Sequence, residues 1–151
     1  MFQYVKSWAS WFVVPFFVDR VTKYLVVSGI VSERELFSFL DIYLTYNRGF
    51  SWGIGSSSCR GQFLLMSALI AMVIVWFCWY MHSAKMNRLE YNVSVLILSG
   101  AVSNFYDRMR FDGVIDFILF HWSDWSFPVF NMADVFISVG TCLFLYLQYK
   151  K

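Results

Sequence analysis

The sequence predicts a membrane α-helical fold with four spans and a small β-structured segment between the first two. Apolar residues make up 59% of the chain and charged residues only 15%, whereas a soluble domain carries about 25% charged residues. Residues 63–81 form nineteen consecutive uncharged positions, which is long enough for a helix to cross a bilayer. For any one such run taken alone, a buried core helix remains the alternative.

The first predicted span covers residues 8–31. An apolar run over 8–18 meets Asp19, Arg20 and Lys23 and then resumes over 24–31. No small-x-small cleavage site precedes Asp19, although a secretory signal peptide would require one. We therefore expect this segment to be retained as a span.

Residues 36–55 predict a β-cradle at the membrane surface, formed by a hairpin or a small curved sheet. Apolar and polar residues alternate over 40–45 and again over 50–54, and Asn47-Arg48-Gly49 between them has turn chemistry. An irregular loop is the alternative. A sheet edge here could pair with an extended substrate through main-chain hydrogen bonds.

The other spans are predicted at 61–82, 91–106 and 131–149, which makes residues 1–151 one integral-membrane domain with both termini on the same side. The uncharged runs at 91–106 and 135–149 are short for a span, so each borrows flanking residues. Five Lys and Arg residues then lie on each side, and the positive-inside rule does not decide the orientation. The grouping of Lys150 and Lys151 with Lys85 and Arg88 favours cytoplasmic termini.

No metal site, cofactor or nucleic-acid partner is expected. Cys59, Cys78 and Cys142 lack the spacing of metal ligands, and His82 and His121 form no H-E-x-x-H motif. The net charge of +2 is modest and gives no reason to expect a nucleic-acid-binding patch.

Asp116 and Asp134 are the foremost candidates for chemistry. They are eighteen residues apart, and each is set in strongly apolar sequence. An acid at the centre of a membrane helix costs about 2.5–3.5 kcal/mol, and such acids are functional by default. Two carboxylates in a water-poor place can share one proton, so that one acts as a base toward water and the other as an acid toward a carbonyl oxygen.

Further polar residues stand at helical spacing near the ends of the predicted first and third spans. Asp19 and Lys23 are four residues apart, so they can pair on one helix face. Asn104, Asp107 and Arg108 stand at i, i+3 and i+4 and also share a face. These spacings predict polar faces directed into the helix bundle.

Asn131 and Asp134 are three residues apart at the start of the fourth span, so this span and the third can present Asn and Asp toward a common interior. An amide beside a carboxylate can donate to it and fix its rotamer. The alternative for each group is interfacial snorkelling or a helix-end ion pair. For Asp107 with Arg108 or Arg110, an ion pair is at least as well supported as catalysis.

Five blocks carry a resemblance that covers nearly the whole chain. They are Asp19-x-x-Thr22-Lys23, Asn47-x-Gly49, Gly100-x-x-x-Asn104-x-x-Asp107-Arg108, Gly113-Val114-x-Asp116-Phe117 and Phe130-Asn131-x-Ala133-Asp134. In these residues and their order, the chain resembles the bacterial lipoprotein signal peptidases, also called signal peptidase II. Two departures are mild: Ser103 stands where the family usually has Gly before its Asn, and Phe50 where it usually has Ala.

The resemblance implies a membrane aspartic endopeptidase of the bacterial cytoplasmic (inner) membrane, with four helices, a periplasmic β-cradle and cytoplasmic termini. Its substrates would be prolipoproteins that carry diacylglyceryl on a cysteine, cut just before that cysteine, and membrane lipids would be its other partners. The implied catalytic pair is Asp116 and Asp134. The residues implied to bind substrate or support the site are Asn104, Arg108, Asn131, Ala133, Asp107, Asp19, Lys23, Asn47 and Gly49.

Two other functions remain open on the residues alone. A small membrane transport or channel subunit could use the two carboxylates as a proton or cation relay. Against this, the chain has only four predicted spans and lacks the visible internal repeat from which many transporters are built. A serine–lysine membrane peptidase could use Lys23 and a hydroxyl such as Ser51. Asp19 lies one helical turn from Lys23, which would keep the amine charged and a poor base.

Overall fold

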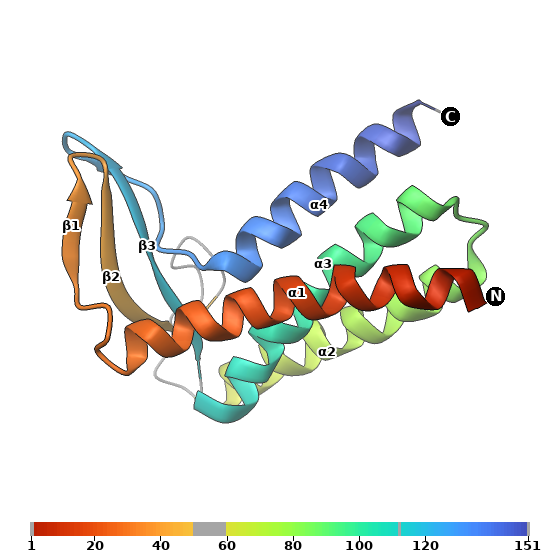
Figure 1. The fold of residues 1–151 in the computed structure, drawn as a ribbon. Coiled ribbons are helices and arrows are strands. Elements are labelled where there is room, and N and C mark those ends of the chain that lie inside the picture. Colours follow the sequence, from red (N-terminus) through yellow and green to blue (C-terminus); the bar gives the residue numbers. More distant parts are fainter. Residues whose placement is uncertain (1, 50–59, 112, 151) are drawn as a thin grey trace.

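The computed structural model of the protein describes the backbone of residues 2–49, 60–111 and 113–150, with side chains from residue 9 onward. Within these residues the helices are α1 (Phe2–Val27), α2 (Arg60–Ser83), α3 (Arg88–Phe111) and α4 (Met132–Tyr149). The strands are β1 (Arg34–Phe37), β2 (Leu40–Asn47), β3 (Val114–Trp122) and β4 (Trp125–Ser126). Figure 1 shows the helices extending from the sheet at one end toward both termini at the other.

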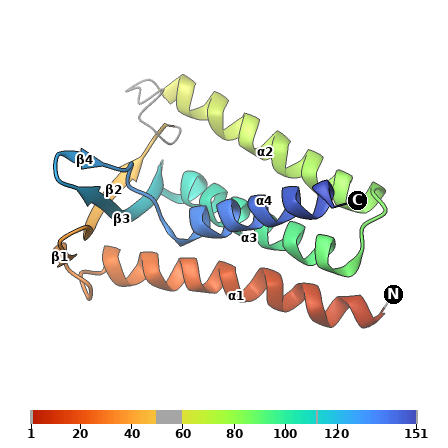
Figure 2. The ribbon, with the colours of Figure 1, turned by 90° about the horizontal axis from the view of Figure 1, so that it is seen from above.

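α3 is the central helix and packs against α1, α2 and α4. The crossing of α3 and α4 is close because glycines occupy the contact. A Cβ atom on Gly100 would lie 2.6 Å from the carbonyl oxygen of Ala133, and one on Gly140 would lie 2.7 Å from Cγ1 of Ile97. α2 and α4 meet at the end remote from the sheet, where the rings of Tyr80 and Phe144 lie 6.4 Å apart, and Figure 2 shows the two helices diverging toward the sheet.

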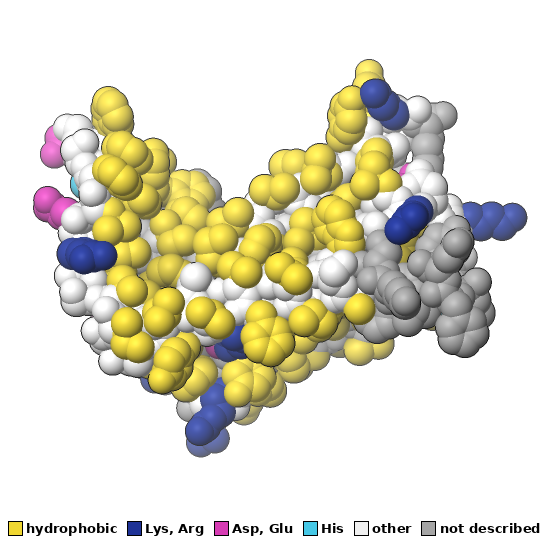
Figure 3. Space-filling model, viewed as in Figure 1, with side chains coloured by type: hydrophobic (Ala, Val, Ile, Leu, Met, Phe, Trp, Pro, Cys, Tyr) yellow, Lys and Arg dark blue, Asp and Glu magenta, His cyan; other side chains and the backbone are white. Residues whose placement is uncertain are grey.

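The outer surface of the helices is strongly apolar. In the described part of the chain, α2 and α4 are long and apolar enough to cross a membrane. Their outward side chains include Trp76, Trp79 and Leu145, which are 56%, 64% and 62% exposed. Hydrophobic side chains also dominate the face shown in Figure 3. Such large exposed apolar surfaces mark contact with lipid or protein.

The third helix is longer than the span expected at 91–106. It begins at Arg88 because Asn87 and Glu90 form a capping box: the Glu90 N–H donates to Asn87 Oδ1 at 3.0 Å and the Asn87 N–H to Glu90 Oε2 at 2.9 Å. It continues through Asp107 to Phe111. A rule that ends a span at the first charged residue misses this last turn, where Asp107 is paired with Arg20 and Lys23 of α1.

The sheet is antiparallel, in the order β1-β2-β3-β4. The expectation that the cradle lies between the first two helices was therefore incomplete, because β3 and β4 come from the connection between α3 and α4. β3 carries no alternating pattern, since Val114 to Phe117 are buried on both faces of the strand. Of the expected hairpin, residues 40–47 form β2, whereas 50–54 lie outside the described residues, as do Phe50 and Ser51.

Candidate active site

Asp116 and Asp134 come from different elements and meet around Asn131. Asp116 lies in the buried half of β3 and is 2% exposed. Its Oδ1 accepts from Asn131 Nδ2 at 2.6 Å, and its Oδ2 accepts from Asn47 Nδ2 at 3.0 Å. Asp134 Oδ2 accepts from the Asn131 backbone N–H at 3.2 Å. One asparagine therefore contacts both carboxylates.

The chain reaches this geometry by folding back along β3 before α4 begins. The N–H groups of Phe117 and Ile118 both donate to the carbonyl of Phe130, and the Phe130 N–H donates to the carbonyl of Ile118. This pairing places Asn131 beside Asp116. α4 then begins with a capping box, in which the Asn131 side chain accepts from the Asp134 N–H at 3.0 Å and the Asp134 side chain accepts from the Asn131 N–H.

A second asparagine links the pair to α1. Asn104 Oδ1 accepts from Lys23 Nζ at 2.9 Å, and Asn104 Nδ2 donates to Asp134 Oδ1 at 2.8 Å. Because an ammonium group only donates, the amide oxygen must face Lys23 and the amide nitrogen must face the carboxylate. Asn131 Nδ2 also donates to Asn104 Oδ1 at 3.1 Å. The orientation of both amides is thus fixed by their partners.

The two carboxylates line one pocket of about 270 Å³. The pocket lies at the sheet end of the helices, and its lining also includes Asn47, Gly49, Asn104, Arg108 and the apolar side chains of Ile70 and Ile137. Asn47 is the last residue of β2 and Gly49 lies in the bend that follows, where the Gly49 N–H donates to Asn47 Oδ1 at 3.0 Å. The pocket therefore combines acids, amides and one guanidinium within apolar walls.

Arg108 supplies the positive charge of this pocket. It is 6% exposed, and its Nη2 donates to the Gly49 carbonyl at 2.9 Å. Its Nη1 is buried and has no hydrogen-bond partner among the described residues. A buried donor without a partner is costly, so this nitrogen is suited to bind an acceptor that enters the pocket.

Burial raises the pKa of Asp116 to about 7, and the negative charge of Asp134 acts in the same direction. Hydrogen bonds from Asn47 and Asn131 and the charge of Lys23 lower the pKa but only partly offset this rise. A carboxyl with a pKa near 7 is held partly protonated at neutral pH, which is the condition for a general acid beside an ionised partner.

A cluster of four charged side chains, three of them buried, links α1 to α3 beside the pocket. Lys23 Nζ lies 2.8 Å from Asp19 Oδ2 and 2.7 Å from Asp107 Oδ2. Arg20 bridges the same two acids, at 3.0 Å from Asp19 and 2.5 Å from Asp107. The formal charges of the four residues sum to zero, as a buried ionic cluster requires.

Each acid of this cluster also holds the backbone next to one pocket carboxylate. Asp19 Oδ1 accepts from the N–H of Ala133 at 2.9 Å, and Asp107 Oδ2 accepts from the N–H of Ile115 at 3.3 Å. Ala133 precedes Asp134, and Ile115 precedes Asp116. The cluster therefore ties α1 and α3 to the two segments that carry the pocket acids.

Comparison with known proteins identifies the family of this chain. The sequence profile of the family described as signal peptidase (SPase) II matches residues 11–150. The chain belongs to the signal peptidase II family. It is 35% identical over 146 residues to a lipoprotein signal peptidase of Clostridium tetani, covering 92% of this chain and 90% of that protein. It is 31% identical over 149 residues to one of Burkholderia vietnamiensis, covering 97% and 90%.

Two solved structures share this fold. One bacterial membrane enzyme superposes with a TM-score of 0.77 at 29% identity, covering 97% of this chain and 89% of that chain. A second superposes with a TM-score of 0.80 at 24% identity, covering 97% and 95%, and supports the fold. The signal peptidase II chain described here is therefore a membrane protein, as its exposed apolar helices indicate.

The structure brings together the residues that the sequence singled out. The pocket is lined by Asn47, Gly49, Asn104, Arg108, Asp116 and Asp134. Asn131 contacts both of its acids. The neighbouring charged cluster and its backbone contact contain Asp19, Lys23, Asp107 and Ala133. The expected pairing of Asp19 with Lys23 is confirmed. Asp107 does form an ion pair, but with Arg20 and Lys23 of α1 rather than with Arg108 or Arg110.

Two residues at this cluster were missed from the sequence. In the sequence Arg20 stands out only as a neighbour of Asp19 and Lys23. Its ion pair with Asp107 was not predicted, because Asp107 lies far away in the chain. Ser103, noted as a departure from the family pattern, donates from its hydroxyl to Asp19 Oδ2 at 2.7 Å. The departure therefore adds a hydrogen bond to the buried cluster.

Lys23 is poorly placed to act as the base of a serine–lysine peptidase. It is 1% exposed, lies within 2.8 Å of two carboxylates and donates to Asn104. All three of these partners are acceptors, so the ammonium group is fully engaged as a donor and has no free position toward a substrate hydroxyl. In the described residues, no group of three or more His, Cys, Asp or Glu side chains is arranged to hold a metal ion.

Proposed function

We propose that this protein is an aspartic endopeptidase that removes the signal peptide from diacylglyceryl-modified prolipoproteins by cutting just before the lipidated cysteine. The observation that carries the proposal is the pair Asp116 and Asp134, held around one pocket by Asn131 in a member of the signal peptidase II family. The curated relatives in Clostridium tetani and Burkholderia vietnamiensis are lipoprotein signal peptidases, which supports prolipoproteins as the substrate.

In this proposal Asp134 acts first as the base and Asp116 as the acid. Asp134 lies in the first turn of α4 and accepts from Asn104 Nδ2 and the Asn131 N–H, contacts that stabilise a carboxylate. It takes a proton from water as the water oxygen attacks the scissile carbonyl carbon. Asp116, protonated, donates to the carbonyl oxygen, which supports the tetrahedral intermediate.

The intermediate then collapses and the carbon–nitrogen bond breaks. The departing nitrogen takes the proton that Asp134 received, and the oxygen returns its proton to Asp116, so the pair begins the next cycle with one shared proton. Because the two acids interact, that proton belongs to the pair, and their titrations are coupled. Arg108, with Nη1 free of protein partners among the described residues, would hold a carbonyl of the bound peptide.

The same proposal places all four helices across the bacterial cytoplasmic membrane, with the sheet on the extracytoplasmic side and both termini in the cytoplasm. Both termini lie at the end remote from the sheet, and Lys85, Arg88 and Lys150 fall in or beside the helix ends there. This placement leaves the substrate lipid in the bilayer while the scissile bond meets water.

A direct cleavage assay tests the proposed function. One prolipoprotein is prepared with and without the diacylglyceryl group and is incubated with the purified protein in lipid vesicles. We expect cleavage before the cysteine of the lipidated form and at most a trace with the unlipidated form. Equal cleavage of both forms would contradict the proposed specificity, and proton or cation flux without any cleavage would favour the transport alternative.

A further inference from the structure

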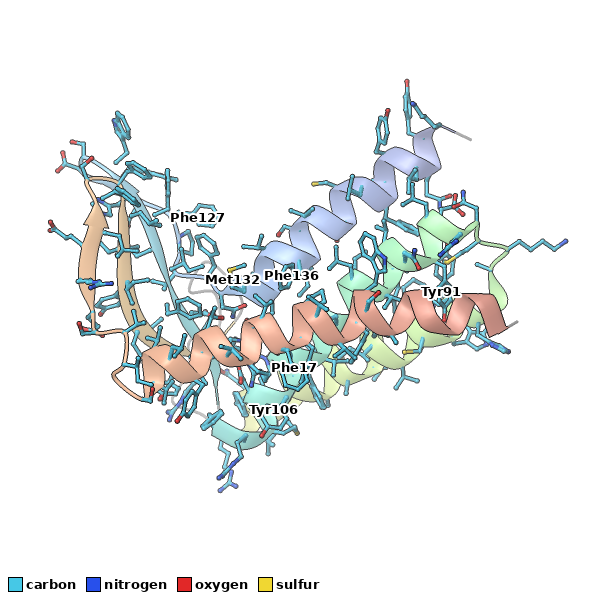
Figure 4. The ribbon with its side chains drawn as sticks, viewed as in Figure 1. Phe17, Tyr91, Tyr106, Phe127, Met132 and Phe136 are labelled. Carbon is cyan, nitrogen blue, oxygen red and sulfur yellow. The ribbon has the colours of Figure 1, made fainter. Side chains whose placement is uncertain are left out.

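A second pocket, of about 370 Å³, adjoins the catalytic pocket at Asp134. It lies between residues 127–130, which precede α4, and the first two turns of α4, where its lining residues are Asp134, Val135, Ser138 and Val139. Figure 3 shows a hollow between the sheet and α4 with hydrophobic side chains on both walls. In Figure 4, Phe127 lies on the sheet side of this hollow, across from the start of α4.

The pocket is apolar and opens along the outer surface of α4. Six of its eight lining residues are apolar, and only Asp134 and Ser138 bring polar side chains. Val139, at its far end, is 49% exposed. α4 itself is apolar enough to cross a membrane. A flexible apolar chain could therefore leave the pocket along α4 without entering water.

The backbone around the pocket offers little to an extended peptide. The N–H groups of Phe127 and Phe130 already donate to β3, and the Phe130 carbonyl already accepts from it. Pro128 has no N–H to offer. A peptide buried here would leave its own amide groups unpaired, which is costly. An acyl chain has no such groups, so burial of its methylenes is favourable.

We propose that this second pocket binds one acyl chain of the substrate's diacylglyceryl group. The assignment rests on the function proposed above, in which the bond that is cut directly precedes the lipidated cysteine. The lipid then begins one residue from the scissile bond, and Asp134, which lines both pockets, marks where they join. The catalytic pocket, with its amides and Arg108, takes the peptide, and the second pocket takes the chain.

Ser138→Phe tests this assignment because it fills the second pocket without changing either carboxylate. Thr141→Phe is the matched control, since Thr141 is also a small exposed hydroxyl residue on α4 but lies outside the pocket lining. Ser138→Leu is a milder second variant, and thermal melting in detergent checks that all three fold. Two substrates with the same peptide are compared, one carrying dihexadecanoylglyceryl and one dibutanoylglyceryl on the cysteine.

We expect Ser138→Phe to raise KM for the dihexadecanoyl substrate about tenfold, which corresponds to the loss of roughly two buried methylene groups. Its kcat should change by less than about twofold, because a filled pocket weakens binding and leaves the acids in place. KM for the dibutanoyl substrate should change little, because that chain is too short to reach Ser138. Ser138→Leu should give a smaller rise, and Thr141→Phe none.

Two results would overturn the assignment. In the first, Ser138→Phe leaves both KM values unchanged. In the second, it changes them equally and alters the preference for the residue before the scissile bond, which would mean that the pocket holds peptide. Failure of the unmodified protein to cleave either lipidated substrate would instead refute the proposed function, so the two failures are distinguishable.

Discussion

Asp116→Asn should make the folded protein more stable above neutral pH, although it removes a proposed catalytic group. The carboxyl is buried, and its pKa in the folded protein is raised from 3.8 to about 7. In the unfolded chain it ionises near its ordinary value. Its contribution to stability is therefore complete below about pH 4 and is lost as the pH rises to about 7.

The structure sets the size of this effect. At about 1.4 kcal/mol per pKa unit, the rise in the pKa of Asp116 corresponds to roughly 4 kcal/mol between acid and neutral pH. Asparagine carries no such charge. It does place an NH₂ group against one of the two amide donors, Asn47 Nδ2 or Asn131 Nδ2, which costs about 1–3 kcal/mol. The net gain at pH 8 should therefore be about 1–3 kcal/mol.

The measurement is the free energy of unfolding by SDS in mixed micelles at pH 4, 6 and 8, for the parent and for Asp116→Asn. The difference, variant minus parent, should increase from pH 4 to pH 8 and change sign on the way. Asp124→Asn, the same substitution at an exposed position, should give a difference near zero throughout, because water solvates that side chain in both states. If the free energy of unfolding depended on pH in the same way for the parent and for Asp116→Asn, the reasoning that burial disfavours the ionised form of Asp116 would be refuted.

Two further predictions concern the support of the site, each measured as a change in the same free energy of unfolding. Gly100→Ala should cost about 1–3 kcal/mol by overpacking, because its Cβ would meet the backbone carbonyl of Ala133. Gly140→Ala should cost less, because the atom its Cβ would meet most closely belongs to the side chain of Ile97, and the nearest backbone atoms lie 3.5 Å away; equal losses would contradict this. Arg20→Gln leaves the buried cluster with one excess negative charge and should cost roughly 3 kcal/mol. The double variant Arg20→Gln/Asp107→Asn restores neutrality and should recover part of that loss, and no recovery would show that charge balance is not the role of Arg20.

The helices could be predicted from the sequence wherever a run is free of charge. Residues 63–81 lie wholly inside α2, because lipid-facing positions need apolar side chains. The last turn of α3 could not be predicted this way. It contains Asp107, whose partners Arg20 and Lys23 lie on α1, and spacing along one helix reveals only local partners.

The sheet was only half predictable. β2 carries a visible alternation, but Val114 to Phe117 of β3 are buried on both faces, and such a strand reads as a plain apolar run. The pairing of β2 with β3 joins segments about seventy residues apart, as in the opposition of Thr45 and Asp116. No local pattern encodes that contact. The sequence therefore placed the cradle only between the first two helices, whereas the connection between α3 and α4 also contributes strands.

The residues of the candidate site could be named from the sequence, but not their geometry. Two acids in apolar sequence and the five family blocks pointed to Asp116 and Asp134. That Asn131 would contact both acids depends on the return of residues 127–130 along β3. The hydrogen bond from Ser103 to Asp19 likewise depends on how α1 packs against α3, which spacing within either helix does not reveal.

The most direct test of the account is the turnover of Asp116→Asn, Asp134→Asn and the double variant on a lipidated prolipoprotein, with each protein purified and shown to be folded. If one acid serves as base and the other as proton donor, each single substitution should remove nearly all turnover. The double variant should be little worse than either single, because groups that act as a unit are not additive. Substantial turnover by either single variant would contradict the assignment of this pair as the catalytic dyad.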